Sequence, residues 1–168
     1  MNKETINTAI LFISLVLLQI IVLNNINFLG YINPYLYIIF IFIYPIRKTD
    51  NTLLLLSFIL GLFIDFFSNT GGVNAAATLF ITFIRIPVLK IVLGKREIDY
   101  NSISLIKLPF FRTYSYITIL TIIHHFIVFG LEYFKWDNFG IIILKTILTS
   151  IFTVVLVMIS FTFIPRKK

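Results

Sequence analysis

Two ionisable residues interrupt one of the most apolar stretches of this sequence. Asp65 lies shortly before a polar break that contains glycine, and Arg85 follows ten small or mostly apolar residues after Asn74. A charge at membrane depth costs free energy, so it rarely persists without a partner or a function. The segment from Gly61 to Arg85 is therefore the first place to look for chemistry or for a contact site.

The polar and small side chains of this stretch follow helical spacing. Ser57, Gly61 and Asp65 are four residues apart, so they share one face of a helix. The next apolar run carries a second stripe with similar spacing, formed by Asn74, Thr78, Thr82 and Arg85. Small residues allow helices to approach closely, and Gly72 belongs to a connection flexible enough for a tight turn. We expect the two stripes to face each other.

Asp65 has two possible kinds of partner. One is Arg85, but this residue is eleven positions into its helix and would lie about 16 Å deeper in the membrane. A long arginine side chain also reaches toward the nearer membrane surface. The other kind is the backbone N–H groups and hydroxyls near Asn74. The second arrangement is favoured, and it gives Asp65 a structural role.

A third polar stripe is predicted on a later helix. Its members fall within an arc of about 60°, and they are Tyr114, Thr118, Thr121, His125 and Glu132. His124 lies beside the stripe, so the histidine pair indicates a metal site, a proton relay or a hydrogen-bonded contact between helices. Adjacent histidines on a helix diverge by about 100°, which is poor geometry for a shared metal ion, so the contact is favoured.

Lys145, Thr149 and Thr153 line one face of the last apolar run. Lys145 would lie close to the membrane surface, where it could neutralise Glu132 or Asp137. Structural pairing is the favoured interpretation of this face.

The sequence contains none of the common enzyme motifs. There is no G-x-S-x-G elbow, no H-E-x-x-H and no phosphate-binding loop. Asp65 and Glu132 are the only acids expected near membrane depth, and they lie on different helices. The absence of cysteine excludes disulfide and thiol chemistry. We therefore expect a protein that is not an enzyme, with no catalytic residue, metal ligand or cofactor.

The composition indicates what must position these residues. Of 168 residues, 59% are hydrophobic and 12% are charged, whereas soluble domains average about 25% charged residues. A spanning helix needs about 20 apolar residues. We expect one all-α, polytopic membrane domain over residues 1–168 with about six transmembrane helices, of which the second and third are short. The predicted helices cover residues 5–23, 33–44, 52–67, 74–93, 113–134 and 140–164.

The basic residues predict how the chain is oriented. With both termini in the cytoplasm, eleven of the 14 Lys and Arg residues lie in inner segments. The net charge of +7 then reflects topology and attraction to anionic lipid, and nucleic acid is not an expected partner. The longest inner loop, residues 94–112, mixes apolar and charged residues, so it is either a solvated connector or a segment along the lipid headgroups.

The chain resembles the bacterial rod shape-determining protein MreD family. The resemblance rests on the letters GLFIDFF from Gly61, GVNA from Gly72, and Arg85, together with the length, the helix count and the basic C-terminal tail. Asn74 departs from the family, whose members often carry a larger or aromatic polar residue there. The resemblance implies a non-enzymatic subunit of the cell-elongation machinery in the bacterial cytoplasmic membrane. Its implied partners are the bitopic protein MreC and, through it, MreB, RodA and its transpeptidase.

The resemblance also implies a fold similar to the substrate-binding subunits of energy-coupling-factor transporters. A small-solute-binding subunit of a transporter is therefore the alternative function. Such subunits typically present an Ala-x-x-x-Ala face on the first helix, but here Ala9 is followed four residues later by Ile13. They also need a polar outer cavity, which the short outer loops supply poorly. The membrane scaffold is the favoured interpretation.

Overall fold

The computed structural model describes residues 3–26, 32–46, 51–94, 99, 103–133 and 139–163. The regular structure of these residues is helical, with short 3-10 turns between the longer helices. The elements are, in order, α1 (Lys3–Ile21), η1 (Leu23–Asn25), η2 (Leu36–Ile38), α2 (Ile39–Ile43), α3 (Asn51–Ser68), α4 (Val73–Leu93), η3 (Leu105–Lys107), α5 (Phe110–Tyr133) and α6 (Phe139–Phe163).

Five helical stretches of the described residues are long and apolar enough to cross a membrane. They are Thr5–Asn25, Asn51–Ser68, Val73–Leu93, Phe110–Tyr133 and Phe139–Phe163. Large apolar side chains such as Phe66 and Phe163 are about four-fifths exposed on the outside of the bundle, as expected where lipid is the solvent. Because lipid offers no hydrogen bonds, helices that satisfy their own backbone are the favoured spanning form. The chain is an all-α polytopic membrane protein, as its composition predicts.

The predicted second helix, 33–44, differs from the structure. These residues form an irregular stretch followed by η2 and the five-residue α2, so they make no continuous spanning helix. Pro34 and Pro45 flank the stretch, and proline cannot donate a backbone hydrogen bond and restricts the residue before it. The other predicted helices match α1, α3, α4, α5 and α6 to within three residues at the described ends.

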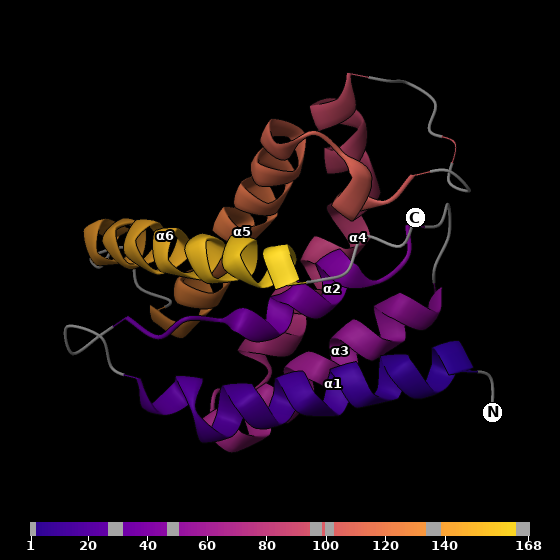
Figure 1. The fold of residues 1–168 in the computed structure, drawn as a ribbon. Helices are drawn as coiled ribbons and strands as arrows, with labels where there is room; N and C mark the ends of the chain where they lie inside the picture. The colour runs from indigo at the N-terminus through magenta and orange to yellow at the C-terminus, as the bar shows by residue number, and fades with distance from the viewer. Residues whose placement is uncertain are drawn as a thin grey trace.

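Residues 32–46, called here the buried segment, nevertheless run through the depth of the bundle (Figure 1). At one end, the carbonyl of Pro34 accepts a hydrogen bond from Gln19, near the end of α1. At the other end, Pro45 lines a groove together with Thr5, near the start of α1. The buried segment is therefore antiparallel to α1. Irregular backbone at membrane depth is tolerated only when protein surrounds it.

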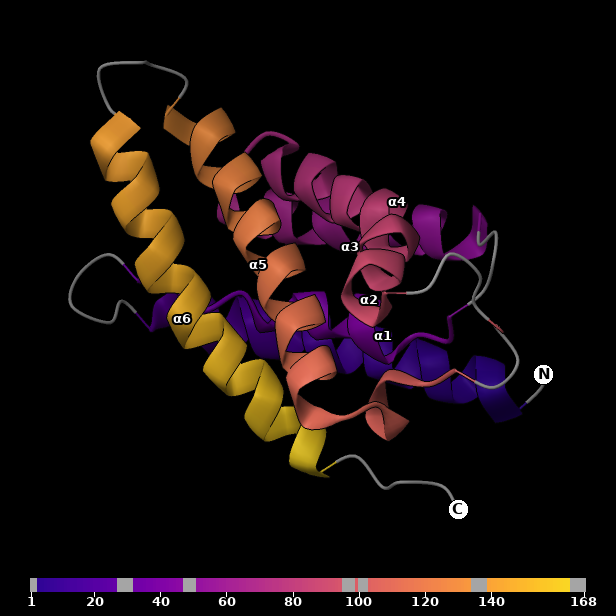
Figure 2. The same cartoon turned by 90° about the horizontal axis from the view of Figure 1, so that it is seen from above.

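The buried segment is the centre of the hydrophobic core. Tyr37 and Phe40 are fully buried, and the core around them includes side chains from α1, α3, α4, α5 and α6. In Figure 2, α5 lies beside α4, while α6 lies at the edge of the bundle and packs on α5.

Candidate functional site

Asp65 caps the first turn of α4 from the neighbouring helix α3. Its carboxylate accepts hydrogen bonds from the backbone N–H groups of Asn74 at 2.9 Å and Ala75 at 2.8 Å. These N–H groups lie in the first turn, where a helix has no acceptor of its own. A negative charge at this position also interacts favourably with the helix dipole. Asp65, only 4% exposed, thus takes the place of an N-cap side chain.

Two side chains complete the surroundings of this carboxylate. The Thr70 hydroxyl and the Asn74 amide both donate to Oδ1 of Asp65. All four hydrogen bonds to the Asp65 carboxylate come from the α3–α4 connection or from α4. The prediction that Asp65 bonds to groups near Asn74 is confirmed, and the alternative of a direct pair with Arg85 is wrong.

The connection that brings Asp65 to α4 depends on left-handed backbone conformations. Gly71 and Gly72 have φ of 64° and 95°, and Asn69 has φ of 56°. Glycine adopts such angles without steric cost, and asparagine tolerates them better than most residues. The turn therefore reverses the chain within a few residues and aligns the carboxylate with the first N–H groups of α4.

Helices α3 and α4 touch at the level of their backbones. A methyl group added at Gly61 would lie 2.6 Å from the backbone nitrogen of Ala75, and closer still to its Cα. One turn further along, the Thr78 hydroxyl lies 3.0 Å from the Ser57 carbonyl of α3 and 2.7 Å from the Asn74 carbonyl of its own helix, and it can donate its proton to either. The two predicted polar stripes do face each other, and only glycine fits at position 61. The Thr82 hydroxyl, by contrast, bonds within its own helix.

Arg85 donates hydrogen bonds to the buried segment and not to Asp65. Its guanidinium donates from Nη1 to the Ile41 carbonyl at 3.2 Å and from Nη2 to the Pro45 carbonyl at 2.7 Å. Arg85 is only 2% exposed, so these bonds compensate part of the cost of removing its charge from water. The side chain points away from the Asp65 end of α4, in the direction that snorkelling predicts.

Two further side chains satisfy the irregular backbone of the buried segment. Gln19 donates to the Pro34 carbonyl at 2.9 Å and accepts from the Tyr37 N–H at 3.3 Å. The Thr153 hydroxyl accepts from the Tyr35 N–H at 3.2 Å. Together with Arg85, these side chains replace the hydrogen bonds that a continuous helix would have made for itself.

A chain of hydrogen bonds extends from Asp65 into the middle of the bundle. The Tyr37 hydroxyl lies 2.9 Å from Oδ1 of Asn74 and 3.0 Å from Nε2 of His124. An ionised Asp65 only accepts, so Asn74 must turn its NH₂ group toward Asp65 and its oxygen toward Tyr37. Tyr37 must then donate to Asn74, and Nε2 of His124 must carry a proton. Every donor in the chain points toward Asp65.

This series of hydrogen bonds is suited to holding helices together and poorly suited to moving protons. The Asn74 amide separates Tyr37 from Asp65, and a neutral amide does not take up or release a proton near neutral pH. The bonds connect α3, α4, α5 and the buried segment. We refer to Tyr37, Asp65, Asn74, His124 and His125 as the polar core.

His125 makes the interhelical contact that the sequence favours. Its Nδ1 lies 2.8 Å from the Thr121 carbonyl and 3.1 Å from the Ser150 hydroxyl of α6. Both histidine rings pack edge-on against Tyr35, with centroids 5.9 Å and 5.1 Å away. Within the described part of the chain, no three His, Cys, Asp or Glu side chains come together as a metal site.

The first and last residues of the polar stripe on α5, Tyr114 and Glu132, are not part of the polar core. Glu132 and Tyr114 are exposed, whereas Thr121 and His125 are fully buried. Lys145 donates its hydrogen bond to the Tyr133 hydroxyl, while its charge also acts on Glu132, one of the two acids that it was expected to neutralise. Its ammonium nitrogen lies 4.9 Å from the centroid of the Tyr133 ring, on the side of the hydroxyl. Asp137, the other expected partner, lies outside the described residues.

Two important residues are not predicted by the motifs of the sequence. Gln19 is an isolated polar residue in an apolar helix, and Tyr37 is a tyrosine within an apolar run. Both patterns are signals, because a buried polar group needs a partner. His124, which the sequence places beside the third stripe, is the histidine that joins the hydrogen-bond chain.

No family model, no curated protein and no solved structure matches this chain. The fold and the polar core define its class, an all-α polytopic membrane protein with a network of buried polar contacts between its helices.

Proposed function

We propose that this chain is a non-enzymatic membrane subunit of the bacterial cell-elongation machinery, of the MreD type. The observation that carries the proposal is the docked α3–α4 hairpin. Gly61 and Asp65, which carry much of the resemblance to that family, lie where the two helices meet, and so does Asn74. Their common property is to hold two helices in one fixed arrangement, as a scaffold requires.

The buried polar groups form hydrogen bonds within the protein, which supports a scaffold over an enzyme. Asp65 is surrounded by four donors that belong to the protein itself. The guanidinium of Arg85 is bonded to backbone carbonyls, and the Asn74 amide interrupts the path from Tyr37 to Asp65. A general acid or base must instead reach the substrate proton it transfers.

The transporter subunit is the second candidate function. Solute sites have a few polar groups that converge on a cavity. In the polar core, Tyr37 bonds to both Asn74 and His124, so the hydrogen-bonding groups of Tyr37 and Asn74 are used within the protein, whereas Nδ1 of His124 is buried without a partner among the described residues. The internal bonds of Tyr37 and Asn74 favour the scaffold.

The proposal includes an orientation and a set of partners. With both termini in the cytoplasm, the end of the α3–α4 hairpin that holds Asp65 faces outward. The end of the buried segment that holds Pro45 faces inward. The direct partner is an MreC-like bitopic protein, and MreB, RodA and its transpeptidase are reached through it. The bacterial cytoplasmic membrane is the proposed location.

Depletion of the protein in its own rod-shaped host tests this function. We expect the cells to become round, and we expect re-expression of the wild-type chain or of Glu132→Gln to restore rods. Asp65→Ala should restore them poorly and should recover less of the MreC-like protein on co-purification. Rods that stay normal after depletion, in a host with no second copy, would contradict the proposal. Uptake of a vitamin-like solute that stops on depletion would favour the transporter subunit.

A further inference from the structure

Five polar atoms in the interior of the bundle have no hydrogen-bond partner among the described residues. They are four threonine hydroxyl oxygens and one ring nitrogen, and all belong to α5 or α6: Thr118, Thr121, Nδ1 of His124, Thr146 and Thr149. The buried Thr82, by contrast, donates to a carbonyl of its own helix at 2.8 Å. Burying a polar group without a partner costs free energy, so these atoms indicate a ligand that can form hydrogen bonds with them.

Three of the five atoms form a row along α5. Thr118, Thr121 and His124 follow one another at intervals of three residues. Side chains at this spacing are neighbours on a helix, with about 5–6 Å between their Cβ atoms. Two hydrogen bonds of about 2.8 Å each, one on either side of a water molecule, cover the same distance. The spacing of the row therefore fits one water molecule between each pair of neighbours.

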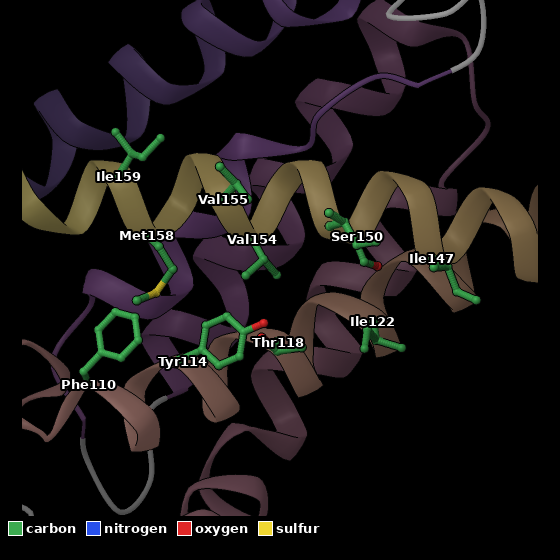
Figure 3. Close-up of a pocket in the computed structure, with 11 residues that line it drawn as sticks. Phe110, Tyr114, Thr118, Ile122, Ile147, Ser150, Val154, Val155, Met158 and Ile159 are labelled. Atoms are coloured by element: carbon green, nitrogen blue, oxygen red, sulfur yellow. The ribbon is translucent and has the colours of Figure 1, made fainter.

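The row begins at a groove that has room for water. The partly buried Thr118 and Ser150 of α6 line this groove, which lies between α5 and α6 and has a volume of about 350 Å³ (Figure 3). A water molecule takes about 30 Å³ in the liquid, so the space beside Thr118 is sufficient. The Ser150 hydroxyl also lies 3.1 Å from Nδ1 of His125, so the groove adjoins the polar core.

The row ends at a histidine nitrogen that needs a donor. Nε2 of His124 carries the proton that points to the Tyr37 hydroxyl, 3.0 Å away. In a neutral imidazole the other nitrogen is then an acceptor. His124 is fully buried, and no donor among the described residues reaches its Nδ1. Water both donates and accepts, so it can connect the Thr121 hydroxyl to this nitrogen.

We infer that two water molecules lie along α5, one between Thr118 and Thr121 and the other between Thr121 and Nδ1 of His124. The second water molecule donates to Nδ1. It thereby fixes the tautomer of His124 on which the series of hydrogen bonds toward Asp65 depends. This inference does not depend on the proposed function.

Solid-state NMR of the full chain in lipid bilayers tests the site by polarisation transfer from water to isotope-labelled histidine and threonine side chains. We expect fast transfer to His124 and Thr121, although both are fully buried, and slow transfer to Thr78, which is equally buried. Thr121→Val keeps the shape of the side chain but removes the hydroxyl, so it should slow the transfer to His124 severalfold. Thr82→Val is the matched control and should leave that transfer unchanged, because the Thr82 hydroxyl bonds within its own helix.

The stability of Thr121→Val provides a second measurement. If the hydroxyl binds water, its removal leaves a buried water molecule with fewer partners, and the unfolding equilibrium constant should rise by about fivefold. If the hydroxyl is buried without water, its removal relieves an unfavourable burial, and the variant should be more stable than the wild type.

Three outcomes would overturn the site. They are greater stability of Thr121→Val than of the wild type, slow transfer from water to His124 in the wild type, and equal transfer in the Thr121→Val and Thr82→Val proteins. Fast transfer to His124 from lipid headgroups and not from water would also contradict the inference, because it would place a lipid hydroxyl beside Nδ1.

Discussion

Replacing Asp65 by asparagine should destabilise the protein even though the side chain keeps its size. The carboxylate accepts three hydrogen bonds through Oδ1 and one through Oδ2. An asparagine presents an NH₂ group where one of these oxygens lies. Whichever oxygen it replaces, at least one buried donor, such as the N–H of Ala75, then faces another donor.

The magnitude follows from this count. A buried donor left without a partner costs about 1–3 kcal/mol. Loss of the negative charge at the start of α4 costs about 0.3–1 kcal/mol more. The free energy of unfolding should therefore fall by about 1–4 kcal/mol. Asp65→Ala should cost more, because it leaves the N–H groups of both Asn74 and Ala75 without acceptors.

Reversible unfolding in mixed detergent and dodecyl sulfate micelles, followed by circular dichroism, measures this change. Glu132→Gln is the matched control, because it makes the same chemical change at an exposed position and should alter stability by less than about 0.5 kcal/mol. If Asp65→Asn were as stable as Glu132→Gln, the carboxylate could not be what holds the start of α4.

Three further predictions test other contacts by the same unfolding measurement. Gly61→Ala should cost about 1–3 kcal/mol because two backbones must separate, whereas Gly130→Ala, whose added methyl meets nothing within 4 Å, should be neutral or slightly stabilising. An equal response to both would refute the close approach of α3 and α4. Arg85→Gln should lower stability by about 1–3 kcal/mol and speed hydrogen exchange in α2, because two carbonyls lose their donor; unchanged exchange would argue against this role. Tyr37→Phe and Asn74→Ala should be non-additive by about 0.5–3 kcal/mol in a double-mutant cycle, and simple additivity would mean that their hydrogen bond contributes nothing.

The α3–α4 hairpin could be predicted because its determinants are local. Asp65 and Asn74 are nine residues apart, and the glycines between them allow the chain to turn back at once. The spacing of Ser57, Gly61 and Asp65 then determines which face of α3 meets α4. Such contacts follow from helix geometry and a short connection, so no knowledge of the remaining fold is needed.

The buried segment could not be predicted in the same way. Its apolar letters are equally typical of a short spanning helix, since hydropathy reports burial and not backbone conformation. What stabilises its irregular form is distant in sequence: Gln19, Arg85 and Thr153. The two flanking prolines were the local signal against a continuous helix. The carbonyls that accept hydrogen bonds from Arg85 belong to this segment, so they could not be predicted either.

The most direct test of the proposed role is association with an MreC-like protein of the same cell. The tagged wild-type chain, expressed at its native level, would be purified from membranes in mild detergent alongside a tagged, unrelated multi-pass protein as control. The account predicts that the MreC-like protein is recovered with this chain and not with the control. A folded, monodisperse chain that recovers no MreC-like protein, from cells in which that protein is abundant, would contradict the account.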